Sequence, residues 1–86
     1  MRIAWETSAW DDYCLWQTAD RKVALRINRL IKEASRAPDS GIGKPEALRG
    51  DLSGLWSRRI TDEHRLVYAW TPEAITIIAC RYHYGD

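Results

Sequence analysis

The chain has no excess of charge of either sign. Thirteen basic and twelve acidic side chains give its 86 residues a formal net charge of +1. Proteins dedicated to binding nucleic acid usually carry a strongly basic balance. Any nucleic-acid site in this chain must therefore come from local clustering of basic residues, or the chain must borrow affinity from a larger partner.

Long apolar runs are also missing. The first residues, Met1 to Glu6, contain no apolar segment of the signal-peptide kind, and no run approaches the roughly 20 residues that a membrane span needs. We expect a soluble, cytoplasmic protein. Cys14 and Cys80 lie far apart and lack CxxC spacing, so in a reducing compartment we expect two buried thiols rather than a disulfide.

Phenylalanine is absent, but the chain has five Trp and four Tyr. Its length predicts a single domain over residues 1–86, and a domain of this size buries only about 60–65% of its unfolded surface. Large aromatic rings bury much apolar area per residue, so we expect most of them in the core. The same rings can stack on nucleobases.

The first half of the chain predicts a short strand and a helical hairpin. Polar and apolar residues alternate around Ile3 and Trp5, which is typical of a strand. Ser8 and Asp11 have the spacing of a capping box and predict the start of a first helix, which continues through Trp10, Tyr13, Cys14 and Gln17.

Asp20 can cap a second helix, which Pro38 ends because proline is not tolerated in a helix interior. Its apolar residues recur at helical spacing: Val23, Ile27, Leu30, Ile31 and Ala34. Turn formers fill residues 39–45, and β-prone runs with hairpin connections follow at 55–60, 65–70 and 75–82. The order β-α-α-β-β-β predicts an α+β domain with the helical hairpin packed on a mostly antiparallel sheet.

Several catalytic signatures are missing. Gly41 and Gly43 lack the strand–helix context of a phosphate-binding loop, and His64 and His83 have no neighbouring residues at metal-ligand spacing. No serine or cysteine nucleophile motif is present. We therefore expect neither metal nor covalent catalysis, and no cofactor.

RNA can be cut without metal because its 2′-hydroxyl is a built-in nucleophile. The protein must then supply a base, a cation for the phosphoryl oxygens and an acid for the departing 5′ oxygen. Residues of these types are present in the C-terminal half, with an aromatic residue that can stack a base: Glu46, Arg65, His83 and Tyr84, with Lys44, Arg49, Arg58, Arg59 and Arg81 around them.

Each of these residues also has a plainer explanation. Glu46 can be a solvated loop charge, and His83 can be a surface residue of a strand. Arg65 can pair with Asp62 or Glu63, a surface contact worth about 0–1 kcal/mol. Spacing alone therefore does not distinguish a ribonuclease.

Neighbouring residues in a strand point to opposite faces, so only one of Arg58 and Arg59 can easily face a given substrate. Tyr82 and Tyr84 share one parity, which leaves open that one lies in the core and the other at the rim. His64 falls in a predicted hairpin turn and is interpreted as a turn residue.

Five segments carry a resemblance to a known family over the whole chain, at residues 10–13, 43–46, 52–60, 64–68 and 80–84. The block Leu-Ser-Gly-Leu-Trp-Ser-Arg-Arg-Ile and the terminal Arg-Tyr-His-Tyr are its most specific parts. The sequence resembles the YoeB-type toxins of the RelE superfamily, whose compact fold is microbial-ribonuclease-like.

The resemblance implies a toxin of a type II toxin–antitoxin pair, held inactive by a cognate antitoxin protein. Such toxins enter the ribosomal A site, cut messenger RNA there and inhibit translation, so the ribosome would supply most of the placement that a near-neutral protein lacks. The resemblance also implies a homodimer, and contact with operator DNA only through the antitoxin complex.

Carried over by motif, Glu46 matches the general base and His83 the general acid. Arg65 matches the arginine that stabilises the phosphate, and Tyr84 matches a residue that orients the substrate. Accessory cations complete the predicted substrate-binding set: Lys44, Arg49, Arg59 and Arg81.

The chain departs from the family pattern at two places. Ala47 follows Glu46 where relatives commonly have proline, which should loosen the loop slightly because alanine does not fix φ. Gly85 and Asp86 extend past Tyr84, where relatives often stop, and this puts in doubt any role for a terminal carboxylate.

Two other functions remain open. The same scaffold can inhibit a protein target such as DNA gyrase without nuclease chemistry, but those relatives generally lack a Glu/His acid–base pair. The second open function is that of a decayed copy, which only binds an antitoxin or operator DNA. Having Glu46, Arg65 and His83 together favours the nuclease.

Overall fold

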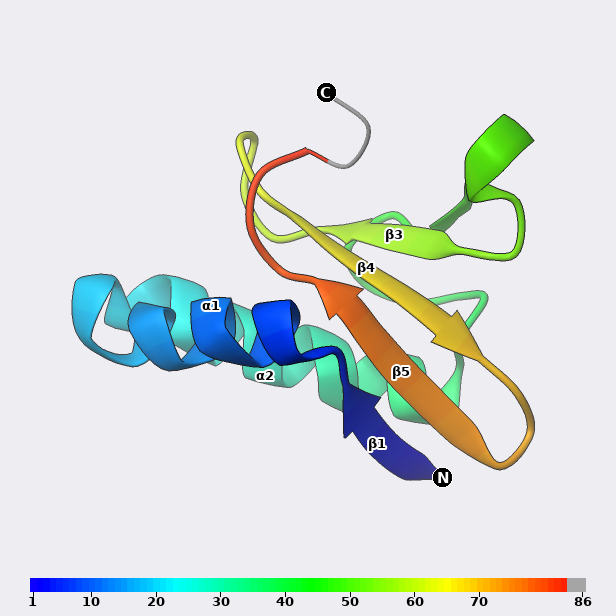
Figure 1. The fold of residues 1–86 in the computed structure, drawn as a ribbon, viewed down its shortest axis with the longest axis horizontal. Helices are drawn as coiled ribbons and strands as arrows, with labels where there is room; N and C mark the ends of the chain where they lie inside the picture. Colours follow the sequence, from blue (N-terminus) through cyan, green and yellow to red (C-terminus); the bar gives the residue numbers. More distant parts are fainter. Residues whose placement is uncertain (84–86) are drawn as a thin grey trace.

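A computed structural model describes residues 1–83 of the chain (Figure 1). Two helices, α1 (Thr7–Ala19) and α2 (Arg21–Arg36), follow the first strand. The strands are β1 (Arg2–Trp5), β2 (Glu46–Ala47), β3 (Trp56–Arg59), β4 (Arg65–Trp70) and β5 (Ala74–Ala79), with a 3-10 turn at Gly50–Leu52. The predicted α+β order is confirmed, and β2 is an addition to it.

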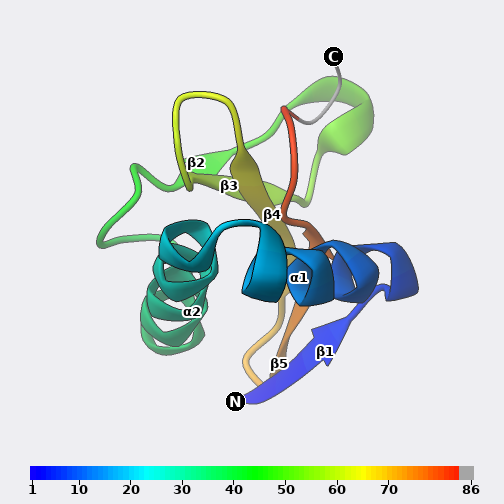
Figure 2. The same cartoon turned by 90° about the vertical axis from the view of Figure 1, so that its left-hand side faces the viewer.

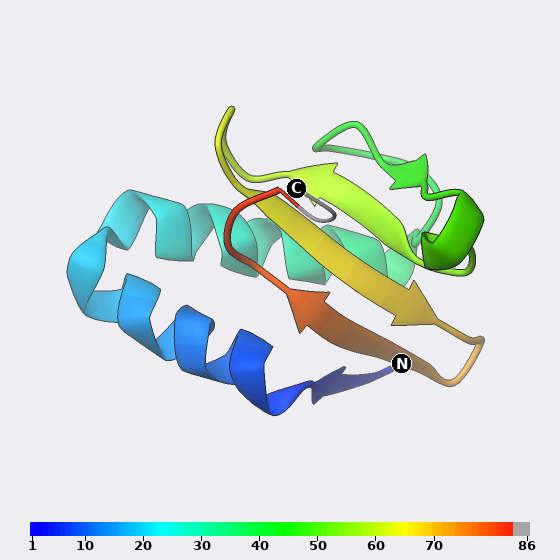
Figure 3. The ribbon, with the colours of Figure 1, turned by 45° about the horizontal axis from the view of Figure 1, so that its top comes forward.

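The five strands form one sheet in the order β1-β5-β4-β3-β2. β1 runs parallel to β5, while the other three pairs are antiparallel, so the prediction of a mostly antiparallel sheet is confirmed. Both helices lie on one face of the sheet (Figure 2). The opposite face, seen in Figure 3, is crossed by the C-terminal segment that follows β5.

The core lies between α2 and the sheet. All five predicted apolar positions of α2 are buried, together with Ala24, against Leu66, Tyr68, Ile75 and Ile77. Asp20 caps the helix as predicted, because its carboxylate accepts hydrogen bonds from the backbone N–H groups of Lys22 and Val23. The helix ends at Arg36, just before Pro38.

The first helix differs from its prediction. It begins at Thr7 after Glu6, and no side chain caps it, so the predicted capping box at Ser8 is wrong. The buried residues of α1 are Ala9 and Trp16, whereas Cys14 is exposed. Only Cys80 of the two cysteines is a buried thiol.

Most aromatic rings contribute to the core, as expected. Trp16 and Tyr68 are buried, and four other rings pack against the core from partly buried positions. Among residues 1–83, Trp10 and Tyr82 are the exceptions, with about half of each residue exposed (47% and 52%). Within residues 1–83, no helix has the length and apolar character that crossing a membrane requires.

Candidate functional site

The register of β2, β3 and β4 brings Glu46, Arg59 and Arg65 onto one face of the sheet. Glu46 pairs with Ser57, and Arg59 pairs with Arg65. Paired residues share a face, and so do residues two apart in one strand. This is the face that the helices leave uncovered (Figure 3). Strand spacing and rise place the Glu46 and Arg65 Cα atoms about 12 Å apart, within reach of one phosphodiester through their long side chains.

Glu46 lies in a strand and not in the loop that the sequence predicted. The strand is only two residues long and exposed, so its position depends on the loop before it. Gly43 fixes that loop to β3, because its carbonyl accepts a 2.7 Å hydrogen bond from the Arg59 backbone N–H. Gly43 and Lys44 both have positive φ, which turns the chain sharply into Glu46.

Arg58 holds the earlier part of this loop from the opposite side of the sheet. Its guanidinium is fully buried and donates to the carbonyls of Ala37, Ser40 and Ile42 at 2.6, 2.7 and 3.0 Å. Its Nε donates to the Tyr68 hydroxyl at 2.9 Å. Arg58 and Arg59 therefore do face opposite ways, as predicted, and Arg58 has a scaffolding position that leaves it inaccessible to substrate.

Tyr68 completes the support beneath the loop. Its hydroxyl donates to the Pro38 carbonyl at 2.6 Å. Burial raises the pKa of this phenol, and the hydrogen bond from the Arg58 cation opposes the rise. The phenol therefore remains a neutral donor, which the bond to a carbonyl oxygen requires.

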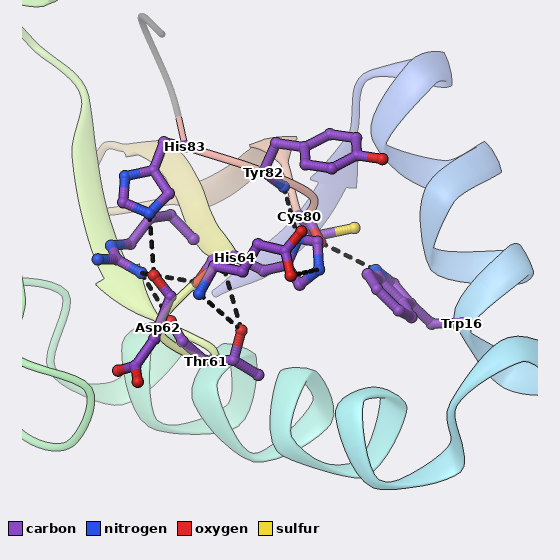
Figure 4. Close-up of polar contacts among 9 residues, drawn as sticks. Trp16, Thr61, Asp62, His64, Cys80, Tyr82 and His83 are labelled. Carbon is purple, nitrogen blue, oxygen red and sulfur yellow. Dashed lines mark hydrogen bonds and ion pairs between the residues drawn. The ribbon is translucent and has the colours of Figure 1, made fainter.

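Arg65 and His83 meet at one backbone oxygen in the β3–β4 hairpin (Figure 4). The Asp62 carbonyl lies 3.2 Å from Arg65 Nη1 and 2.9 Å from His83 Nε2. Since a carbonyl oxygen can only accept, His83 Nε2 carries a hydrogen. His83 is exposed and Arg65 half-buried, so a proton donor and a guanidinium stand side by side at the end of the uncovered face.

Arg65 is oriented by backbone and not by carboxylates. Its Nη1 also donates to the carbonyls of Thr61 and His64, at 2.6 and 3.1 Å. Within residues 1–83, no ion pair joins Arg65 to Asp62 or Glu63. The plainer alternative of a surface salt bridge is therefore not observed, and the guanidinium charge is left without an acidic partner in the part of the chain described.

The segment that carries His83 differs from its prediction. Strand β5 ends at Ala79 and not at Tyr82, whose φ of 61° is in the left-handed region. His64 is not a simple turn residue, because it is only 9% exposed and its Nδ1 accepts a 2.8 Å hydrogen bond from the Tyr82 backbone N–H. The ring contacts Trp16, whose indole N–H donates to the Cys80 carbonyl at 3.0 Å.

The predicted accessory cations fall into two groups. Lys44, Arg49 and Arg59 are exposed along β2, β3 and the loops beside them. Arg81 instead lies 3.6 Å from the Asp12 carboxylate of α1 and stacks on the Tyr82 ring, so it is directed away from the Glu46 side of the sheet. Tyr84 lies outside the described residues.

A second surface feature lies across the molecule, where β1 meets the two helices. Trp5, Trp10 and Tyr13 form an aromatic cluster with ring centroids 4.7 to 5.5 Å apart. Together with Ile3 and Asn28 they line an open groove of about 450 Å³. An exposed apolar groove of this kind is typical of a protein-binding surface.

The sequence of the chain matches known toxins along nearly its full length. The profile of the YoeB-like toxins of bacterial type II toxin–antitoxin systems matches residues 5–84. Toxin YoeB of Escherichia coli K12 is 55% identical over 84 residues, which cover 98% of this chain and all of the relative.

Solved structures agree with this match. A YoeB/ParE toxin from Agrobacterium tumefaciens superimposes with a TM-score of 0.94 at 49% identity, over 98% of this chain and all of that one. A YoeB–YefM complex and a YoeB dimer, both from Staphylococcus aureus, give TM-scores of 0.89 and 0.91 at 42% and 44% identity, each over 98% of both chains.

The fold and the matches thus define a small α+β toxin of a toxin–antitoxin system. More narrowly, the chain belongs to the YoeB family.

Proposed function

We propose that this protein is a metal-independent endoribonuclease that cuts messenger RNA in the ribosomal A site and so inhibits translation. The observation that carries the proposal is the convergence of Arg65 and His83 on the Asp62 carbonyl, at the end of a sheet face that also bears Glu46 and Arg59. A base, a cation and a proton donor on one accessible face are the groups that 2′-hydroxyl attack requires.

In the proposed reaction Glu46 removes the 2′-hydroxyl proton, and the 2′ oxygen attacks the adjacent phosphorus. Arg65 stabilises the charge on the non-bridging oxygens, with Arg59 and Lys44 as accessory cations. His83 gives a proton to the departing 5′ oxygen as the P–O bond breaks. The products are a 2′,3′-cyclic phosphate and a 5′-hydroxyl, so the step needs no oxidant and no metal. Tyr84 is proposed to orient the substrate.

Charge segregation supports placement by the ribosome. Helix α2 carries six basic residues and one acidic residue, whereas residues 6–20 carry four acidic residues and no basic one. Lys22, Arg29 and Lys32 are exposed on α2, and Lys32 also lines the aromatic groove. Within residues 1–83 no ion pair engages them. A basic stripe about 15 Å long from Lys22 to Lys32 on a near-neutral protein fits a phosphate backbone and orients the molecule on it.

A cognate antitoxin is the proposed inhibitor of this toxin in the cytoplasm, since the S. aureus relative forms a complex with YefM. The aromatic groove at β1 supports a protein partner, and the S. aureus dimer supports self-association. Contact with operator DNA is proposed only through the antitoxin complex.

The chemistry can be tested on a defined messenger bound to purified ribosomes. Wild-type protein is expected to leave a 2′,3′-cyclic phosphate and a 5′-hydroxyl, and a single 2′-deoxy nucleotide at the cut site should abolish cleavage. Glu46→Gln should slow the cut by roughly 10²–10⁴-fold, the usual contribution of one proton transfer. Cleavage of the deoxy messenger would refute 2′-hydroxyl attack.

The basic stripe of α2 can be tested separately as the surface that binds the ribosome. Reversing the charge at Arg29 alone should weaken ribosome binding and make it less sensitive to salt. Arg2→Glu, an exposed change on β1, is the matched control and should have little effect. Equal weakening by both variants would show that net charge matters and that the stripe does not.

A further inference from the structure

The neutral His64 ring is buried between α1 and the C-terminal segment. It contacts Trp16 edge-on, with centroids 4.8 Å apart, and lies 5.3 Å from the Tyr82 ring. At 9% exposure it cannot itself meet a messenger. Because Nδ1 accepts from a backbone N–H, the ring proton must sit on Nε2. The exposed Glu63 carboxylate lies 4.0 Å from Nε2.

The backbone on both sides of Tyr82 is fixed by consecutive residues of the hairpin. His64 Nδ1 accepts the Tyr82 N–H at 2.8 Å, and the Arg65 N–H donates to the Tyr82 carbonyl at 3.1 Å. Tyr82 has a φ of 61°, a conformation that a bulky residue rarely adopts unless its surroundings impose it. Figure 4 shows this arrangement, with His64 beneath the segment and His83 beyond it.

The left-handed turn at Tyr82 directs the next residue back over the hairpin. There His83 Nε2 reaches the Asp62 carbonyl at 2.9 Å. An extended Tyr82 would carry His83 onward and away from Arg65. Of these two hydrogen bonds to the Tyr82 backbone, only the one to His64 uses a side chain. A substitution at His64 can therefore remove it and leave every backbone donor and acceptor in place.

We propose that His64 is a positioning residue for His83: its Nδ1 holds the left-handed turn at Tyr82 that sets the proton donor beside Arg65. This inference rests on the proposed function of His83 as general acid. His64 acts through the backbone and touches neither substrate nor the reacting atoms.

The test compares two substitutions at one position. His64→Phe keeps a ring against Trp16 but removes the acceptor, whereas His64→Asn places an oxygen close to where Nδ1 lies. His64→Phe is expected to lower the single-turnover cleavage rate on saturated ribosomes by roughly 10–100-fold, the scale of a misplaced catalytic group, with ribosome affinity unchanged. His64→Asn should recover most of that loss, and Glu63→Gln, beside the other ring nitrogen, should cut as wild type does.

A double-mutant cycle separates positioning from general damage. In a His83→Gln background, His64→Phe should cost almost nothing further, since the group that it positions is gone. An equal loss in both backgrounds, or a wild-type rate for His64→Phe, would overturn the proposal. If His83→Gln itself cuts like wild type, the proposed function fails instead.

Amide exchange gives a readout that does not depend on activity. The Tyr82 amide should be protected in wild type and His64→Asn but exchange rapidly in His64→Phe, while β4 amides stay protected in all three. Long-range proton–nitrogen spectra should show the His64 proton on Nε2. Equal protection of Tyr82 in the three proteins, or a proton on Nδ1, would overturn the proposal even if cleavage is not observed.

Discussion

Replacing the buried Arg58 by methionine should destabilise the protein far more than the same replacement at the exposed Arg59. The side chain is fully buried and donates to four acceptors, three of them carbonyls of the loop that leads to Glu46. Methionine keeps a similar aliphatic volume and removes every donor. The experiment therefore removes the hydrogen bonds and the charge of the guanidinium while keeping most of its packing.

The magnitude follows from what remains after the change. The Ala37 carbonyl retains a weak bond from the Ser40 N–H, and the Tyr68 hydroxyl keeps its own bond to Pro38. The carbonyls of Ser40 and Ile42 lose their donor, at about 1–3 kcal/mol each where water cannot replace it. Removing a buried charge returns part of that cost. We expect a net loss of about 2–4 kcal/mol, which is a large share of the 5–15 kcal/mol typical of small domains.

Urea unfolding followed by tryptophan fluorescence measures this loss. Arg59→Met is the matched control, because Arg59 is the next residue and is exposed, and it should change stability by less than about 0.5 kcal/mol. A loss below about 1 kcal/mol for Arg58→Met would refute the reasoning. It would mean that water satisfies the loop carbonyls as well as the guanidinium does.

Three further predictions concern stability and accessibility. Gly43→Ala should cost about 1–3 kcal/mol more than Gly54→Ala, because both have positive φ but only at Gly43 does an added Cβ meet Leu30 Cδ2 at 2.7 Å; equal losses in thermal melts would contradict this. Burial raises the pKa of the Cys80 thiol to about 12 from 9.0, so the folded state keeps a proton that the unfolded chain loses. The contribution of this protonated thiol to the free energy of unfolding is fully present below pH 9 and is lost as the pH rises to 12, by at most about 4 kcal/mol. A Cys80→Ala variant whose stability declines equally steeply at alkaline pH would contradict this. Iodoacetamide should modify exposed Cys14 in the native protein and Cys80 only on unfolding, and equal native rates would show the burial to be wrong.

Local patterns predicted most of the fold. The α2 stripe and the Asp20 cap depend on residues within a few positions of one another, and the structure confirms both. The two-residue strand at Glu46 could not be predicted, because its pairing with Ser57 depends on β3 and has no alternating run of its own. The start of the first helix was predicted wrongly, because the capping-box spacing of Ser8 and Asp11 is present in the sequence but no side chain caps the helix at Glu6.

For the candidate site too, some residues could be predicted from the sequence, whereas the contacts between distant residues could not. Residue types and the family resemblance named Glu46, Arg65 and His83, and their roles remain predictions. The Asp62 carbonyl that joins Arg65 and His83 has no sequence signal, since any residue has a carbonyl. His64 bonds a residue 18 positions away, so no local pattern could have separated it from a turn residue.

The most direct test of the account is primer extension on a reporter messenger in a bacterial translation extract, with wild type and Glu46→Gln side by side. The account predicts discrete cuts within the translated frame that disappear when initiation is blocked and are strongly reduced in the variant. A messenger left intact by protein that still arrests growth would contradict it and would direct the search to a protein target.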